Sequence, residues 1–170
     1  MCAVIKNGRQ PDATAGQTLV LGMGNSLLRD EGVGVHAVRY LQHWHGDTTG
    51  AEFLDAGTLS FALVSRIEAG RNLIILDAVH MQEPAGTVRV FEGEDMDRFL
   101  KQRRRLSMHE VSLVDLLAIA RLTGLLPPHR ALVGIEPESF DLGEQPTEPV
   151  ARAIPLAAEA VLGLIRRWQA

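Results

Sequence analysis

The chain has 170 residues, which is enough for one domain with a complete hydrophobic core. Hydrophobic residues make up 46% of it and charged residues 22%, as is usual for a globular protein. The formal net charge of −4 argues against a nucleic-acid-binding protein, which would carry a basic face. The single cysteine, Cys2, excludes an internal disulfide and a metal cluster built on cysteines.

The N-terminal segment and the apolar runs indicate where the protein is expected to reside. Residues 1–17 lack the apolar core of a secretory signal, and no later apolar run approaches the roughly 20 residues that cross a bilayer. We therefore expect a cytoplasmic protein with no membrane or nucleic-acid partner. Residues 1–17 are expected to form a flexible tail, and residues 18–170 a single domain.

Strand-like and helix-like segments alternate through the first half of the chain. The short apolar segment 19–21 predicts a buried strand that ends at a glycine, and apolar residues at helical spacing over 33–41 predict a helix. The segment 51–58 (AEFLDAGT) predicts a second strand, closing at Asp55. A helix is expected over 58–70, capped by a threonine and stopped by a glycine.

Three predicted elements follow, of which the first is the strongest strand signal in the chain. Its segment 72–79 (NLIILDAV) contains four consecutive apolar residues, as in a central parallel strand covered on both faces. The alternating segment 86–93 (GTVRVFEG) predicts a strand near the sheet edge. Residues 94–108 are polar and predict a connection with one helical turn at most.

The C-terminal third is predicted to form two helices around a last strand. The segment 109–124 is amphipathic and ends at a glycine, and the segment 130–137 (RALVGIEP) predicts the strand. The terminal helix is expected from Thr147, its cap, with Pro155 as a point where it could kink. This alternation predicts a three-layer α/β/α sandwich around a mostly parallel, twisted sheet of about five strands, one of them antiparallel.

The turn after the first predicted strand begins like a dinucleotide-binding loop and then departs from one. Gly22 and Gly24 fit the opening of a G-x-G-x-x-G fingerprint, but Leu27 occupies the third glycine position. Two carboxylates, Asp30 and Glu31, follow where a pyrophosphate would need backbone amides. The loop therefore does not match a phosphate-binding loop, and what it binds instead stays open at this stage.

Polar side chains follow each of the predicted parallel strands, at the edge where ligands bind in open α/β sheets. Glu31 follows the first strand, Asp55 the second and Asp77 the third. His109 begins the large helix. Taken singly, these residues have structural explanations: an acid at a helix N-terminus, caps of turns and a surface histidine. Together they predict a functional site, because the topology brings them to one rim.

Two carboxylates and an imidazole suit a borderline divalent ion such as Ni²⁺, Zn²⁺, Mn²⁺ or Fe²⁺. The same set could also perform acid–base chemistry without a metal. The chain lacks a G-x-S-x-G elbow and an H-E-x-x-H helix, and its only thiol lies in the N-terminal tail. Nucleophilic catalysis is therefore the weaker hypothesis and a metal-linked reaction the stronger one.

Five segments in series resemble the motifs of the [NiFe]-hydrogenase maturation proteases, over most of the chain from residue 18 onward. They are LGMGNSLLRDEGVG, LDAGT, LIILDAV, SMHEVSLVDLL and LVGIEPES. Two positions depart from the family pattern: Ala56 stands where glycine is common, and Glu110 where glutamine is frequent.

The resemblance implies an endopeptidase that removes a C-terminal extension from the nickel-loaded precursor of a hydrogenase large subunit. The metal-ligating residues of the family fall at Glu31, Asp77 and His109, and the aspartate of its D-G-T-like motif falls at Asp55. We expect Asp55 to orient a water or a metal ligand. Nickel would be supplied by the bound precursor, and the free protein would be a monomer.

Three further hypotheses remain open at this point. A metal-independent hydrolase of small molecules or peptides could use the same architecture, and a nickel-sensing chaperone could bind the precursor without cleaving it. Separately, the basic run KQRRRL at residues 101–106 could hold an acidic surface of the precursor, or could be a solvated loop.

Overall fold

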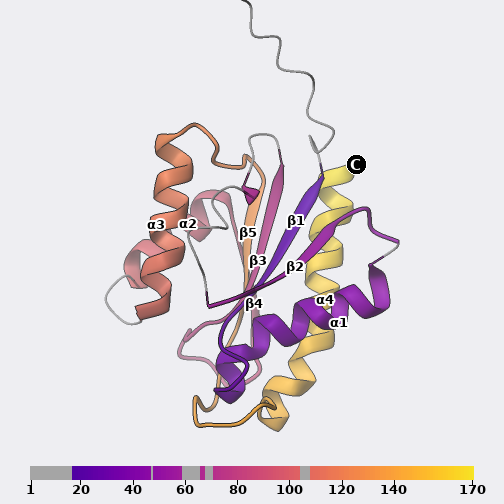
Figure 1. The fold of residues 1–170 in the computed structure, drawn as a ribbon, viewed down its shortest axis with the longest axis vertical. Coiled ribbons are helices and arrows are strands. Elements are labelled where there is room, and N and C mark those ends of the chain that lie inside the picture. Colours follow the sequence, from indigo (N-terminus) through magenta and orange to yellow (C-terminus); the bar gives the residue numbers. More distant parts are fainter. Residues whose placement is uncertain (1–16, 47, 59–65, 68–70, 104–107) are drawn as a thin grey trace, which may run out of the picture.

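A computed structural model describes residues 17–46, 48–58, 66–67, 71–103 and 108–170. Apart from Gln17, the predicted N-terminal tail lies outside these residues. Most of the helix predicted over 58–70 and residues 104–106 of the basic run also lie outside them. Figure 1 shows the described elements as one layered α/β structure.

Five strands form a single sheet in the order β2-β1-β3-β5-β4. Neighbours among β1, β2, β3 and β5 pair in parallel, and β4 pairs antiparallel to β5 at one edge. The sheet therefore matches the prediction, including the central place of β3 and the antiparallel edge strand. The strands are β1 (Thr18–Met23), β2 (Glu52–Gly57), β3 (Asn72–Ala78), β4 (Val88–Glu92) and β5 (Arg130–Ile135).

Helices cover both faces of this sheet. The first described helices are η1 (Arg29–Gly32), a single 3₁₀ turn, and α1 (Val33–His45); α2 (Gly93–Arg103), α3 (Met108–Leu122) and α4 (Glu148–Gln169) follow. The pair α1 and α4 lies on one face, and the pair α2 and α3 lies on the other (Figure 1). This arrangement is the predicted three-layer sandwich. None of the described helices has the length and hydropathy of a membrane-spanning helix.

The alternation of side chains along the strands divides the core into two layers. Ile74 and Leu76 of β3 pack with α1 and α4, whereas Leu73 and Ile75 pack with α2 and α3. The close contact of α1 with the sheet requires Gly34, because a Cβ there would lie 2.1 Å from the carbonyl oxygen of Leu76. The apolar strands predicted from the sequence thus form the middle layer.

The expectation of a mostly irregular connection over 94–108 is wrong, because α2 occupies the greater part of it. The segment is polar on average, which hides a narrow apolar stripe. Met96 and Leu100 are buried in the core, and Phe99 packs against it and stacks on Phe91. This i, i+3, i+4 spacing is enough to hold a helix on the sheet.

The terminal helix begins after Thr147, as predicted, and runs through Pro155. The hydroxyl of Thr147 makes no capping hydrogen bond to the helix. It donates instead to Asp30, 117 residues earlier in the chain. The start of α4 is therefore connected to the loop that follows β1.

Candidate active site at the carboxyl end of the sheet

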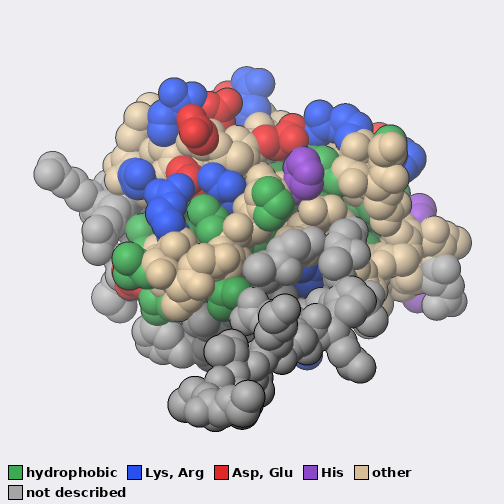
Figure 2. Space-filling model, turned by 90° about the horizontal axis from the view of Figure 1, so that it is seen from above, with side chains coloured by type: hydrophobic (Ala, Val, Ile, Leu, Met, Phe, Trp, Pro, Cys, Tyr) green, Lys and Arg blue, Asp and Glu red, His purple; other side chains and the backbone are tan. Residues whose placement is uncertain are grey.

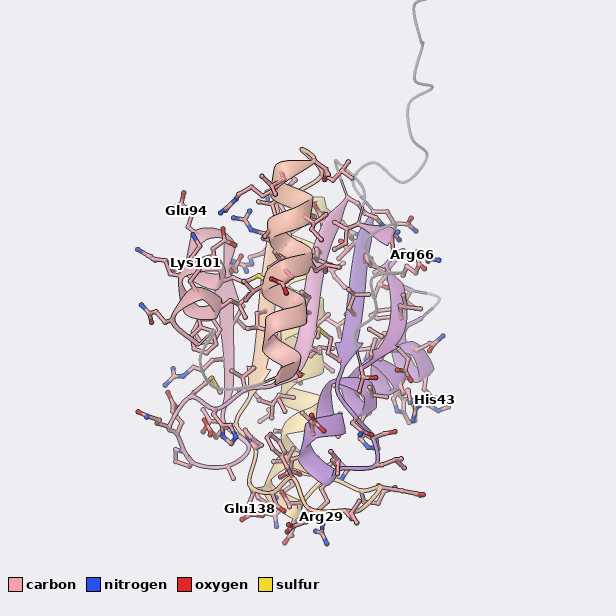
Figure 3. The ribbon with its side chains drawn as sticks, turned by 60° about the vertical axis from the view of Figure 1, so that its left-hand side comes forward. Arg29, His43, Arg66, Glu94, Lys101 and Glu138 are labelled. Carbon is pink, nitrogen blue, oxygen red and sulfur yellow. The ribbon has the colours of Figure 1, made fainter. Side chains whose placement is uncertain are left out.

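The carboxyl ends of the parallel strands meet at one end of the molecule, at the bottom of Figure 1. The loop 24–32 follows β1 there, and the loop 136–147 connects β5 to α4. Figure 3 shows Arg29, from the first loop, near Glu138, from the second. We call this end of the sheet the carboxyl rim.

Gly24 makes the sharp turn by which the chain leaves β1. Its φ of 120° lies where residues with side chains are strained, and a Cβ at this position would lie 1.7 Å from the carbonyl oxygen of Glu31. Its N–H donates to the carbonyl oxygen of Gly57 at 2.9 Å, which ties the loop to the end of β2. The glycine thus lets the loop fold back and places Glu31 at the rim, as the sequence suggested.

The backbone of Arg29 is strained, with a φ of 45°. Its N–H donates to the carbonyl oxygen of Gly143 at 2.7 Å, and the N–H of Gly143 donates to the carbonyl oxygen of Leu27 at 2.9 Å. These bonds flank a parallel bridge between Leu28 and Gly143. The two rim loops therefore hold each other in a conformation that neither sequence favours alone.

Asp30 is fully buried and accepts hydrogen bonds from the second rim loop. Its Oδ2 accepts from the N–H groups of Glu138 and Ser139 at 2.8 and 2.9 Å. Thr147 donates its N–H to Oδ1 at 2.6 Å and its hydroxyl to Oδ2 at 2.9 Å. Asp30 therefore has a structural role, although the sequence places it beside Glu31 as one of two similar acids.

Glu136, at the end of β5, is a second buried carboxylate that binds a loop. Its Oε2 accepts hydrogen bonds from the N–H groups of Met81 at 2.5 Å and Glu83 at 3.3 Å. Its Oε1 lies 3.4 Å from Nδ1 of His80. Sequence reasoning missed this residue, because its partners lie more than fifty residues away.

Glu31 and Asp77 lie at the carboxyl rim, as predicted. Glu31 is half-buried in η1, which packs against β3, and Asp77 is half-buried at the end of β3. The side chain of Asp77 follows the alternation of Leu73 and Ile75 and so faces the layer of α2 and α3. Its Oδ1 accepts a hydrogen bond from the N–H of Ala78 at 2.9 Å.

His109 is the second residue of α3. The N-terminal end of this helix lies toward the carboxyl rim, on the face of the sheet that Asp77 faces (Figures 1 and 3). The side chain of His109 lies outside the part of the chain that is described. Among the side chains that are described, no three His, Cys, Asp or Glu residues are grouped to hold a metal ion.

Asp55 faces the other layer of the structure. Its side chain follows the alternation of Phe53, which packs with α1, and its Oδ2 accepts hydrogen bonds from Nε and a terminal nitrogen of Arg39 at 3.2 and 2.8 Å. Its Oδ1 accepts from the N–H of Gly57 at 3.0 Å. The structure thus places Asp55 on the α1 face of the sheet and Asp77 on the α3 face.

Sequence reasoning also missed His36. This residue lies on α1, near Arg39 of the same helix and near Asp55 of β2. Burial and the Arg39 guanidinium lower the pKa of His36, and the backbone of Glu144 and the Asp55 carboxylate only partly offset them. Its Nε2 is buried and makes no hydrogen bond within the described residues. A polar pair at i, i+3 within the mostly apolar segment 33–41 of α1 was the signal that could have found His36 and Arg39.

The donor chemistry of the rim fits a divalent cation. Carboxylate oxygens from Glu31 and Asp77 are suitable ligands for borderline and hard divalent ions, and an imidazole would favour the borderline ones. The same carboxylates could accept a proton from water. The rim therefore supports the two chemistries that the sequence left open.

Comparisons with known proteins place the chain in one family. The family profile HycI, described as "Hydrogenase maturation protease", matches residues 35–164. The chain is 36% identical over 151 residues to the "Hydrogenase 2 maturation protease" of Escherichia coli, covering 87% of this chain and 90% of that protein. It is 35% identical over 158 residues to the "Hydrogenase expression/formation protein HupD" of Thiocapsa roseopersicina, covering 89% and 71%.

Solved structures agree with this assignment. The hydrogenase maturating endopeptidase HybD from E. coli superimposes with a TM-score of 0.80 at 33% identity, covering 89% of this chain and 93% of that one. The [NiFe] hydrogenase maturation protease HybD from Thermococcus kodakarensis gives a TM-score of 0.72 at 26% identity, covering 88% and 99%. With the family profile, the relatives and the fold in agreement, the chain belongs to the hydrogenase maturation protease family.

Proposed function

We propose that this protein is the endopeptidase that removes a C-terminal extension from the nickel-loaded precursor of a [NiFe]-hydrogenase large subunit. The observation that carries the proposal is membership of a protease family over most of the chain, with a fold like that of the E. coli endopeptidase. The acids at the carboxyl rim support it, because Glu31 and Asp77 lie on neighbouring elements where such folds bind ligands.

In this proposal nickel is part of the substrate. Glu31, Asp77 and His109 bind the ion that the precursor already holds, so the rim recognises a precursor only after its metal has been inserted. Binding at the ion also fixes the nearby peptide bond against the rim. The free protein needs no metal of its own and is proposed to be a cytoplasmic monomer with no nucleic-acid or membrane partner.

Cleavage adds one water molecule across the peptide bond. The hydroxyl joins the carbonyl carbon, the carbon–nitrogen bond breaks, and the departing nitrogen takes up a proton. The substrate's ion can polarise the carbonyl or activate the water, and a carboxylate of the rim can hold the transferred proton. Asp55 is proposed to orient the water or a ligand. Its bonds to Arg39 and Gly57 hold its carboxylate at the end of β2, on the α1 face of the sheet.

The test is intact-mass spectrometry of the precursor after incubation with this protein. We expect the nickel-loaded precursor to lose a C-terminal peptide and the nickel-free precursor to keep its mass. A metal-independent peptidase would cleave both forms. A nickel-sensing chaperone would form a complex with the loaded precursor and leave its mass unchanged.

Substitution of the proposed ligands tests the site. We expect Glu31→Gln, Asp77→Asn and His109→Ala to slow processing by about a thousandfold while the protein stays folded, because each removes a ligand or a proton acceptor. Circular dichroism checks the fold, and Glu159→Gln on the exposed side of α4 is the matched control. Full processing by all three variants would remove this site from the proposal.

A further inference from the structure

Three large apolar side chains are exposed at the carboxyl rim. Leu27 is 58% exposed, Phe140 41% and Leu142 83%. Leu27 and Leu142 come from two loops that are hydrogen-bonded to each other, and Phe140 lies two residues before Leu142 with its ring centroid 5.2 Å from that of His80. Exposed apolar side chains that gather at one place on a protein commonly mark a binding surface.

The backbone under these side chains is held firmly. Leu27 and Leu142 flank the bridge between Leu28 and Gly143, and the carbonyl oxygen of Leu27 accepts the N–H of Gly143. The buried carboxylate of Asp30 fixes both loops from beneath. Binding of a partner here therefore costs little conformational entropy of the loops, and a low cost favours affinity.

The charge around the apolar side chains is acidic. The loop 136–147 contributes the exposed carboxylates of Glu138, Asp141 and Glu144 and contains no lysine or arginine. The opposite loop contributes one exposed basic side chain, Arg29, beside Glu31. A partner that complements this surface carries apolar side chains together with a basic residue.

The position of the surface indicates which partner it serves. Leu27 lies four residues before Glu31 in the loop that follows β1, and Leu142 lies in the loop that follows β5. The apolar side chains and the proposed site of cleavage therefore share one end of the sheet, within the reach of a short extended segment that advances about 3.3 Å per residue.

We propose that Leu27, Phe140 and Leu142, bordered by Glu138 and Glu144, form a docking surface for the segment of the precursor next to the cleaved bond. That segment carries apolar side chains and a basic residue. The proposal rests on the proposed function, because it names how the substrate of that same site is held. We call these five residues the docking surface.

The apolar part is tested with Leu27→Ser and Leu142→Ser. Each has a matched control of similar exposure away from the rim: Leu156→Ser, 59% exposed on α4, and Leu122→Ser, 88% exposed at the far end of α3. Processing of nickel-loaded precursor is followed for each variant, and binding is measured separately by biolayer interferometry. We expect the rim variants to raise KM and Kd by about tenfold with kcat unchanged, and the controls to match the wild type.

The acidic part is tested with Glu138→Gln combined with Glu144→Gln, with Glu159→Gln on α4 as control. We expect the double variant to associate with the precursor several times more slowly at low salt and to differ little at high salt. Equal rates at low salt would overturn the acidic part of the docking surface.

Two results would overturn the docking surface while leaving the proposed function in place. One is efficient processing by wild type and rim variants with the same KM and Kd. The other is a dimer of this protein, seen by analytical ultracentrifugation, that Leu142→Ser dissociates, because a second copy would then be the occupant. If the wild type binds the loaded precursor without processing it, the proposed function fails, and the Kd values alone decide the docking surface.

Discussion

The two ends of the sheet are built on opposite principles. At the amino end, the buried arginines Arg71 and Arg130 pair with carboxylates of Glu52 and Asp97. At the carboxyl rim, the buried charged groups among the described side chains are the carboxylates Asp30 and Glu136, and their main partners are backbone N–H groups of the loops. Figure 2, which views the amino end, shows basic and acidic side chains interspersed there.

The two kinds of contact have different roles. Ion pairs at the amino end connect elements to the sheet, as Asp97 does when it accepts bonds from Arg130 of β5 and Arg121 of α3. Carboxylates that bind backbone amides at the rim fix the course of loops, which are otherwise the mobile parts of a fold. Rigid loops can present Glu31 and the docking surface in one arrangement.

The largest effect is expected from Asp30→Asn, which tests the rim. The amide would turn a donor toward N–H groups that need an acceptor, so we expect a loss of about 3 kcal/mol in the free energy of unfolding. Because Glu31 follows directly, processing should also fall by about a hundredfold. Urea denaturation and the processing assay measure the two effects.

The control for this prediction is Glu159→Gln, an exposed acid on α4 away from the rim, which should change neither quantity. If Asp30→Asn lost stability but processed the precursor fully, activity would not depend on the order of the rim loops.

Asp97→Asn tests the amino end and should have a smaller effect, confined to stability. Its carboxylate is bonded to Arg130 through both oxygens, at 3.1 and 2.8 Å, and these side chains are about nine-tenths buried. We expect a loss of about 2 kcal/mol with kcat unchanged. The matched control on α2 is Asp95→Asn, whose pair with Arg98 is exposed and should leave stability unchanged.

The same residue gives a pH dependence with a definite sign. Burial raises the pKa of Asp97, but the hydrogen bonds and charges of Arg130 and Arg121 outweigh it and hold the pKa below its usual value. The stability that this carboxylate contributes is therefore full above its unfolded pKa of about 4 and is lost as pH falls below that value. Below about pH 4, the free energy of unfolding should fall less steeply with decreasing pH in Asp97→Asn than in the wild type. Equal slopes for the two proteins would contradict a stabilising role for the Asp97 carboxylate.

The smallest effect is expected from Arg39→Ala. Its pair with Asp55 is more than one-third exposed on both sides, so stability should change by less than about 1 kcal/mol. The pKa of His36 should rise, because a repelling guanidinium is removed, and burial should still keep it below its ordinary value. NMR titration measures this shift. A hundredfold loss of processing would show that Arg39 holds Asp55 in the catalytic arrangement.

The sheet could be predicted from the sequence because its strands are marked locally. Four consecutive apolar residues identify β3, and alternation identifies β4 as an edge strand. The helix α2 was missed because its buried residues, Met96 and Leu100, lie among charged neighbours and gain their place only from packing on the sheet. The local composition of the segment does not reveal this tertiary packing.

The position of the carboxyl rim could be predicted, because the topology brings the carboxyl ends of the parallel strands together. The different roles of neighbouring acids could not be predicted. Asp30 and Glu31 are adjacent in sequence, and only contacts more than a hundred residues away assign Asp30 to the interior. The opposite directions of Asp55 and Asp77 follow from the pleat, once the register of each strand is known.

The hydrogen bonds of Asp30 also constrain when activity can arise during synthesis. The N–H groups that fix the first rim loop belong to Glu138, Ser139 and Thr147, so Glu31 has no settled place until the last quarter of the chain has emerged and packed. Closing so long a loop comes late in folding. A partly made chain therefore lacks the groups that order the loop carrying Glu31.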